Sequence, residues 1–326
     1  MITRRRIILA IGTSALAPLA SFAQPRKVWR IGCLWDREQS DYIRRVDAFK
    51  AGMNALGYAE GRDYVIEHRS AQSDLTRLPA LAAELVALKV DVIVSSSTPS
   101  AVAASKATRE IPVLTTTAGD PVGSGLAASL ARPGGNITGL TGLTSELFVK
   151  RLDLLRQLLP RMSRVGFLYD PNNRSNALSL TRFESACAQL KLQSIRAPMR
   201  KPEEMEAAFK TLSRHQAHGL IVTQTATSIA LRKSIIEYAG KHRLPAAYGN
   251  SDWVEAGGLF SYAPDPTDLF RRAAAYADKI FKGAKPGDLP IEQPMRFEFV
   301  LNMKTAKALG LKISNSILVQ ATRVIE

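Results

Sequence analysis

The chain of 326 residues is too long for one small core and suits two linked lobes. Its composition, 46% hydrophobic and 22% charged, excludes a largely disordered protein. Two cysteines are too few for a disulfide framework or a cysteine-rich zinc site. The 44 Lys and Arg residues against 29 Asp and Glu give a formal charge of +15, which raises the question of nucleic-acid binding.

The first 23 residues have the pattern of an export signal. Three arginines at positions 4–6 precede an apolar stretch at 7–20, and Ser21-Phe22-Ala23 places small residues where a signal peptidase reads them. We therefore expect cleavage between Ala23 and Gln24 and a periplasmic location. The apolar stretch is too short for a comfortable membrane span. The arginines fit the twin-arginine route and the general secretory route about equally.

The positive charge is dispersed along the chain. Removal of residues 1–23 takes away three arginines and no acidic residue, so the formal charge falls from +15 to +12. No basic stripe with interleaved aromatic residues is visible, and dispersed charge is typical of a solvated surface. Because no nucleic-acid-binding motif is present either, we expect no nucleic-acid partner.

From Val28 onward, short β-rich runs alternate with long helical runs. Apolar residues at helical spacing predict helices over 41–56 and 74–89, and Thr98-Pro99 suits the start of a third helix. The run 90–94 is almost wholly apolar, as a parallel strand buried on both faces should be. The predicted strands are 28–34, 64–67, 90–94 and 111–114. This order predicts a doubly wound α/β lobe.

A second series of the same kind follows. Pro and Gly at 132–136 interrupt the alternation, which we interpret as the exit from the first lobe, with Ile137 to Leu140 just beyond. The later predicted strands are 164–169, 192–196, 219–223, 244–248, 258–262 and 296–301. The later predicted helices are 145–159, 175–190, 202–212, 228–242, 267–282 and one from Lys304. Two such series imply two Rossmann-like α/β lobes across a cleft, where small ligands bind at the carboxyl ends of strands.

Several stretches together form a specific signature. They are Asp120-Pro121-Val122, Gly125 to Gly139 with Arg132-Pro133-Gly134-Gly135-Asn136 inside it, Arg151 to Leu155, Arg164 to Asn173, and the tail residues 289–294 and 302–311. This signature resembles the ABC transporter substrate-binding protein family of tryptophan and tyrosine type. The resemblance implies a type I periplasmic-binding fold with three hinge crossings and closure on ligand.

The resemblance also fixes the expected division of the chain. We place the crossings near 139–144, 260–263 and 293–297. Residues 24–140 and 263–292 would then form the N-terminal lobe, and residues 141–262 and 293–326 the C-terminal lobe. Cys33 and Cys187 would lie in different lobes, so we expect both thiols to be free and largely buried.

No catalytic or metal-binding constellation is apparent in the sequence. His215 and His218 could share a helix face, but no third ligand is apparent nearby. The Gly-rich loop at 133–136 lacks the spacing of a phosphate-binding loop, and no GxSxG or HExxH motif occurs. We therefore expect no enzyme, no cofactor and no metal site.

In the first lobe, polar residues follow the predicted strands. Ser97 and Thr98 open a helix after a buried strand, where the helix N-terminus favours a carboxylate, and Thr117 ends the next strand. Trp35 ends the first strand and offers a ring for stacking. The alternative for Ser97 and Thr98 is simple helix capping, and for Trp35 it is core packing.

In the second lobe, Gln224 and Asn250 follow successive strands and face the same cleft. Asp252 is the candidate for a carboxylate that meets a ligand ammonium, although it could merely cap the segment that begins at Trp253. If Ser97 and Thr98 hold an anionic end and Asp252 a cationic end, the cleft would bind a zwitterion.

Together these patterns predict an exported, monomeric, non-catalytic solute receptor. It would bind a small molecule, such as an aromatic or other amino acid, in the cleft and deliver it to an ABC permease in the inner membrane. A periplasmic ligand-sensing protein that serves a signalling partner shares this fold and remains the alternative.

Overall fold

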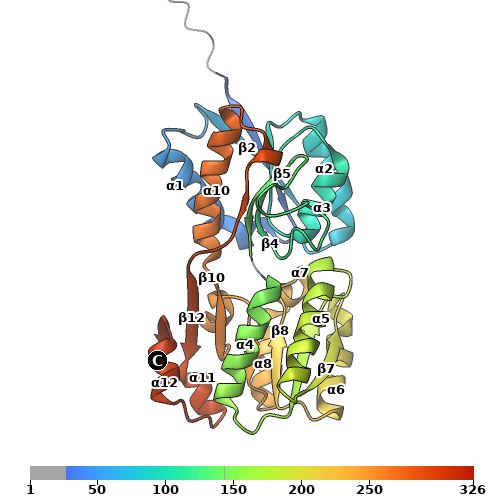
Figure 1. The fold of residues 1–326 in the computed structure, drawn as a ribbon, viewed down its shortest axis with the longest axis vertical. Helices are drawn as coiled ribbons and strands as arrows, with labels where there is room; N and C mark the ends of the chain where they lie inside the picture. Colours follow the sequence, from blue (N-terminus) through green and yellow to red (C-terminus); the bar gives the residue numbers. More distant parts are fainter. Residues whose placement is uncertain (1–26, 143) are drawn as a thin grey trace, which may run out of the picture.

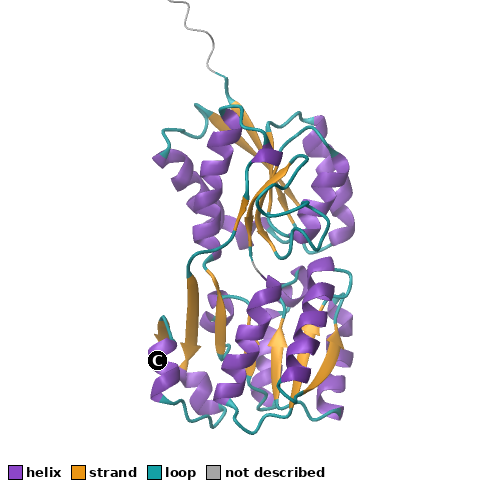
Figure 2. Cartoon of the chain, in the orientation of Figure 1, coloured by secondary structure: helices purple, strands orange, loops and turns teal. Residues whose placement is uncertain are grey.

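The computed structural model describes residues 27–142 and 144–326. The predicted export signal lies outside these residues. Two lobes follow one another along the long axis of the molecule, and each is a sheet between layers of helices (Figures 1 and 2). None of the described helices combines the length and the apolar character that a membrane crossing needs.

The sheet of the first lobe is parallel. In spatial order its strands are β11 (Ile291–Glu292), β5 (Ile137–Thr141), β4 (Val113–Ala118), β3 (Val92–Ser95), β1 (Trp29–Trp35) and β2 (Tyr64–Ser70). Helices α1 (Ile43–Ala55) and α10 (Pro266–Phe281) pack together on one face, and α2 (Leu78–Ala87) and α3 (Thr98–Ala107) on the other (Figure 1). Each face has its own apolar core, the first centred on Trp35, Phe49 and Phe270, the second on Leu34, Leu81 and Ile93.

The sheet of the second lobe is mixed, because β12 and β13 run opposite to its other strands. Its order is β13 (Arg323–Ile325), β12 (Phe297–Asn302), β10 (Phe260–Pro264), β9 (Ala246–Tyr248), β8 (Gly219–Val222), β6 (Arg164–Tyr169) and β7 (Gln193–Pro198), with β12 antiparallel to β10. One core lies under α4 (Thr144–Leu158), α5 (Arg174–Gln189), α11 (Met303–Ala308) and α12 (Asn315–Gln320). The other lies under α6 (Met205–Arg214), α7 (Ala226–Ala230), α8 (Arg232–Lys241) and α9 (Ser251–Glu255).

The predicted fold class of two doubly wound α/β lobes is confirmed, with local differences. The first sheet keeps β5, so the chain leaves the first lobe after Thr141, beyond the Gly-rich turn 132–136 and within the stretch 139–144 expected for the first crossing. The helix predicted over 228–242 is two helices, α7 and α8, because Leu231 has φ −94° and ψ 15° and interrupts the helix.

The chain passes between the sheets three times. It does so after β5, between β10 and α10, and between β11 and β12 (Figure 1). The boundary expected at 262/263 falls inside β10, which stays paired with β12 as far as Pro264, so the second crossing lies about the start of α10. Cys33 in β1 and Cys187 in α5 are free and buried, which confirms that prediction.

The contact between α1 and α10 depends on the absence of a side chain at Gly52. A Cβ there would lie 2.7 Å from the Cβ of Ala274 and would also crowd the carbonyl oxygen of Arg271. Overpacking of this kind costs about 1–3 kcal/mol. We expect Gly52→Ala to lower the free energy of unfolding by that amount, measured by urea denaturation.

Gly240 in α8 is the matched control. It is exposed, and a Cβ there would meet nothing within 4 Å. Gly240→Ala should raise the free energy of unfolding by about 0.5–1 kcal/mol, because alanine restricts the unfolded chain more than glycine does. Equal effects of the two substitutions would contradict the close approach of α1 and α10.

Candidate functional site

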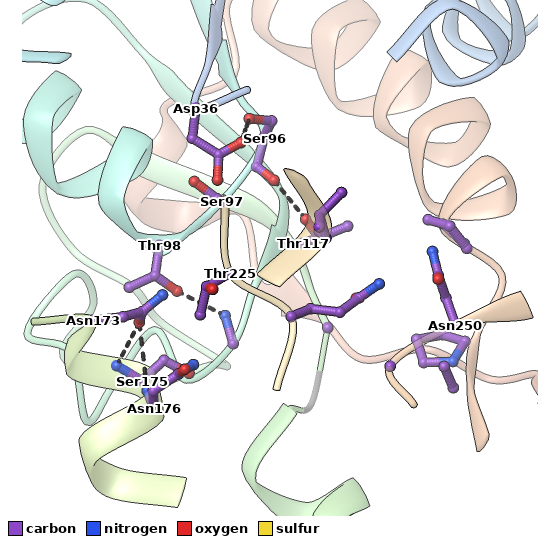
Figure 3. A pocket seen from close by; sticks show the side chains of 18 of the residues that line it. Asp36, Ser96, Ser97, Thr98, Thr117, Asn173, Ser175, Asn176, Thr225 and Asn250 are labelled. Atoms are coloured by element: carbon purple, nitrogen blue, oxygen red, sulfur yellow. Dashed lines mark hydrogen bonds between the residues drawn. The ribbon is translucent and has the colours of Figure 1, made fainter. Parts of the chain in front are cut away.

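A cavity lies between the lobes, where the carboxyl ends of strands from both sheets meet. From the first lobe its polar lining is Asp36, Arg37, Arg45, Ser96, Ser97, Thr98 and Thr117. From the second lobe its polar lining is Arg151, Asn173, Ser175, Asn176, Gln224, Thr225 and Asn250. Figure 3 shows ten of these side chains around the cavity, with Thr98 and Asn173 coming from opposite lobes. Because parallel strands send their carboxyl ends to one edge, both sheets present loops and helix N-termini here.

The first-lobe wall is built around the N-terminus of α3. Ser97 is its N-cap, and the Ser97 hydroxyl and the Ser100 side chain form a reciprocal capping box. The hydroxyl of Thr98 accepts a hydrogen bond from the backbone N–H of Gly119 (3.0 Å), and the hydroxyl of Thr117 donates to the carbonyl of Ser96 (2.7 Å). These hydroxyls therefore fix the loops of the wall to one another and hold the N-terminus of α3 against the cavity.

The second-lobe wall is built around the N-terminus of α5. Asn173 caps the helix, its Oδ1 accepting from the backbone N–H groups of Ser175 (3.1 Å) and Asn176 (3.4 Å). The Oδ1 of Asn176 accepts from the hydroxyl of Thr223 (2.8 Å) and from the backbone N–H of Asp170 (3.3 Å). With its oxygen so occupied, the Nδ2 group of Asn176 is left without a hydrogen bond among the described residues.

Two further polar atoms of this wall are buried without a partner. They are the hydroxyl of Ser175, a residue 2% exposed, and the Oδ1 of Asn250, a residue 5% exposed. A buried polar atom without a hydrogen bond costs about 1–3 kcal/mol. The cavity wall therefore offers a donor, an acceptor and a hydroxyl to a molecule that enters it.

Charged groups lie at the first-lobe end of the cavity. The hydroxyl of Tyr42 donates to Asp36 Oδ1, and Arg37 donates to the Tyr42 oxygen from Nη2 (2.7 Å) while its guanidinium lies over the Tyr42 ring. Burial is the main reason that the pKa of Tyr42 is raised, so its hydroxyl stays protonated near neutral pH.

The described residues contain no group of three His, Cys, Asp or Glu that could hold a metal ion.

Asp252 connects the two lobes. Its carboxylate in α9 accepts hydrogen bonds from Arg44 (2.7 Å) and Arg45 (3.1 Å) of α1, and from Asn250 (3.0 Å) beside it. Burial by itself would raise the pKa of Asp252, but Arg45, Arg232 and Arg44 outweigh it, so the pKa is lowered. A second ion pair between the lobes joins Arg182 of α5 to Asp120 at 3.6 Å.

The structure brings five of the seven sequence-predicted site residues to the cavity. Ser97, Thr98, Thr117, Gln224 and Asn250 all line it. The sequence analysis did not single out Ser175, Asn176 or Arg151, which line it as well. The available signal for Ser175 and Asn176 was Asn173, a typical N-cap residue in the short loop between the predicted strand 164–169 and the predicted helix 175–190.

Trp35 and Asp252 lie elsewhere than predicted. Trp35 is 1% exposed and packs between Tyr42 and His68, with its Nε1 donating to His68 Nδ1 (3.0 Å), so it presents no face to the cavity. Asp252 is outside the cavity lining, and the arginines of α1 occupy its carboxylate. Its observed contacts join the lobes and leave no oxygen directed at a ligand ammonium.

Comparison with known proteins agrees with this geometry. The family described as ABC transporter substrate binding protein matches residues 38–325. A tyrosine-binding protein of Clostridioides difficile (strain R20291) is 27% identical over 264 residues, which are 81% of this chain and 76% of that protein.

Two solved structures share the fold. An ABC domain from Streptococcus pneumonia in complex with L-Trp is 24% identical, with a TM-score of 0.85 over 92% of this chain and 100% of that one. The ligand-free, open structure of a substrate-binding protein from Clostridium difficile is 23% identical, with a TM-score of 0.68 over 92% of this chain and 99% of that one.

The ion pair of Asp252 can be tested through the separation of the lobes. Asp252→Asn removes the charge that holds Arg44 and Arg45, so we expect a larger radius of gyration in small-angle X-ray scattering. Glu184→Gln is the control, because Glu184 pairs with Arg196 inside the second lobe (2.6 Å). An unchanged radius for Asp252→Asn would show that this ion pair does not hold the lobes together.

The same variant has a defined pH dependence. Because the pKa of Asp252 is lowered when the lobes are together, its ionised form favours closure above the ordinary aspartate pKa of about 3.9. That contribution is lost as pH falls through the lowered pKa. The difference in radius between the parent and Asp252→Asn should therefore persist near neutral pH and disappear once the pH is below the lowered pKa of Asp252.

Proposed function

Since this chain belongs to the family of ABC transporter substrate-binding proteins, we propose that it is an exported receptor for a small solute that bears a carboxylate. The solute binds in the cavity between the lobes, and the closed receptor delivers it to a permease of the inner membrane. In this proposal the protein is a periplasmic monomer and carries out no catalysis.

The observation that carries the proposal is the set of polar atoms left without partners on the cavity wall. Ser175 Oγ and Asn250 Oδ1 are buried without hydrogen bonds, and Asn176 Nδ2 has none among the described residues. A solute that hydrogen-bonds to these atoms recovers their lost solvation, which favours binding.

A carboxylate suits the helix N-termini that face the cavity from both lobes. The N-termini of α3, which has 10 residues, and α5, which has 16, reach the cavity from opposite lobes. Each carries partial positive charge at its N-terminus, which favours an anion. The relatives named for tyrosine and for L-Trp bind molecules that contain a carboxylate, so amino acids, aromatic ones included, are the first solutes to test.

Binding and delivery would be coupled by closure. A solute held by groups from both lobes stabilises the closed state by its differential affinity for that state. Two observations support a closed arrangement here, namely the ion pairs between the lobes and the higher TM-score with the L-Trp complex than with the ligand-free, open structure. A permease that recognises only the closed form would then distinguish loaded from empty receptor.

Ser175 provides a direct test of solute binding. Ser175→Ala should weaken binding of the solute that co-purifies from the native host, identified by mass spectrometry, because one hydrogen bond is lost. The expected loss is about 0.5–1.5 kcal/mol, or about two- to tenfold in Kd by calorimetry. The stability of the solute-free protein should not fall, since the hydroxyl has no partner within the protein.

Ser261→Ala is the matched control. Its hydroxyl is also buried and unpartnered in the second lobe, but it does not line the cavity. Its removal should leave Kd unchanged. Equal Kd values for the parent and Ser175→Ala would contradict a solute in contact with this wall, and protein that releases no solute on denaturation and binds none would contradict the receptor proposal itself.

Export can be tested independently of binding. Protein recovered from the periplasm should begin at Gln24, because Ala23 is the last small residue before the polar stretch of the mature chain. N-terminal sequencing checks this, and an intact Met1 on exported protein would contradict it. Replacement of Arg4 and Arg5 together by Lys should block export by the twin-arginine route but not by the general secretory route.

A further inference from the structure

Arg151 is a buried cation on the cavity wall. It lies in α4, is 3% exposed and lines the cavity. Its Nε donates to the carbonyl of Tyr262 (2.8 Å) and its Nη2 to the carbonyl of Gly249 (3.3 Å), whereas its Nη1 makes no hydrogen bond with any described residue. The guanidinium is thus held in place by two backbone carbonyls, with one nitrogen still able to donate.

Arg151 also lacks a counter-charge. Three other charged side chains line the cavity. Asp36 and Arg37 pair with each other, and Arg45 pairs with Asp252, which lies outside the cavity lining. No carboxylate of the described residues forms an ion pair with Arg151. Burial lowers the pKa of Arg151 to about 9, which leaves the guanidinium protonated at neutral pH. Arg151 is therefore the charged lining residue that has no ion-pair partner among the described residues.

A buried charge without a partner of opposite charge lowers the stability of a protein. Removal of one partner from a buried ion pair is strongly destabilising for the same reason. A ligand of opposite charge removes that cost on binding. A zwitterion has no net charge and would leave the positive charge of the cavity in place. A solute with one excess negative charge would neutralise it.

The apolar part of the lining is aliphatic. It comprises Leu147, Ala263, Pro264, Pro266, Leu269 and Ile229, and no aromatic side chain of the described residues is among the lining residues. Trp35 and Tyr42, the large rings closest in sequence to Asp36, are buried in the first-lobe core. A solute in this cavity would therefore meet alkyl surface and would have no ring to stack against.

We propose that the solute is a small, non-aromatic carboxylate of net charge −1, and that Arg151 binds its carboxylate group. The inference rests on the proposed function and specifies the solute class of that same site. Two kinds of molecule have this chemistry: aliphatic 2-oxo or 2-hydroxy acids, and acidic amino acids whose ammonium is offset by a second carboxylate. Both place one excess negative charge beside Arg151.

The test uses pairs of solutes that differ in net charge and little else. The mature protein, freed of bound solute by unfolding and refolding, is titrated by calorimetry with L-leucine against 4-methyl-2-oxopentanoate, and with L-glutamine against L-glutamate. L-Tyrosine against 4-hydroxyphenyllactate provides an aromatic pair. We expect the anion to bind at least tenfold more tightly than its neutral partner in an aliphatic pair, and more tightly than either aromatic solute. A preference for the anion in the leucine pair indicates an oxo or hydroxy acid, and a preference for the anion in the glutamine pair indicates an acidic amino acid.

Variants assign the effect to Arg151. Arg151→Gln should weaken binding of the preferred anion by about 10- to 150-fold, the loss expected for a charge-assisted contact, and should reduce the preference within the pair. Arg151→Lys should retain much of that preference. Arg156→Gln, the same change at an exposed position of α4, should alter neither. If Arg151→Gln fails to fold, the preference of the parent protein for the anions still decides the proposal.

The outcomes separate the inference from the proposed function. If solutes bind but neither aliphatic pair favours its anion, or if an aromatic solute binds most tightly, the inference is overturned and a solute receptor remains. If no pair binds, the net charge of the solute that mass spectrometry finds in native protein decides: −1 supports the inference, and zero or a positive charge overturns it. Absence of any bound solute, with no binding in the titrations, overturns the proposed function and the inference with it.

Discussion

The arrangement of this molecule follows from two parallel sheets whose carboxyl-terminal edges face each other. In a parallel sheet every crossover helix begins at the same edge, so loops and helix N-termini collect there. With two such edges opposed, polar groups from β1, β3 and β4 meet polar groups from β6, β8 and β9 around one cavity. No local feature of either lobe would produce that concentration of unpaired hydrogen-bonding groups by itself.

The two walls differ in how completely they are satisfied. In the first lobe, Ser97, Thr98 and Thr117 bond to their own loops, so that wall is preorganised. In the second lobe, Ser175 and Asn250 retain unpartnered oxygens. A wall that is complete before binding contributes shape and the field of a helix terminus, whereas an incomplete wall gains hydrogen bonds when a solute arrives. If one wall closed onto a solute held by the other, binding would use the preorganised first-lobe wall and the new hydrogen bonds of the second-lobe wall.

Charge is organised in the same way. Asp252 receives Arg44 and Arg45 across the gap between the lobes. Arg151 is held by carbonyls of its own lobe and has no such counter-ion among the described residues. The ion pairs of Asp252 therefore depend on the distance between the lobes. The environment of Arg151 instead depends on the charge of a molecule in the cavity.

The sequence by itself determined the α/β alternation, because helical and strand periodicities are local and Pro, Gly and capping residues mark their ends. It also placed Ser97, Thr98, Thr117, Gln224 and Asn250 at strand ends, and strand ends of parallel sheets are where such residues meet. Only the tertiary structure decided the rest. Arg44 and Asp252 are 208 residues apart, and Trp35 at a strand end turns inward to Tyr42 and His68. The period of α4 does not reveal that Arg151 is buried beside the cavity. The contact of Asp252 depends on how the two lobes lie against each other, and the burial of Trp35 and Arg151 depends on packing within each lobe. These contacts join residues far apart in the chain, so no local sequence pattern encodes them.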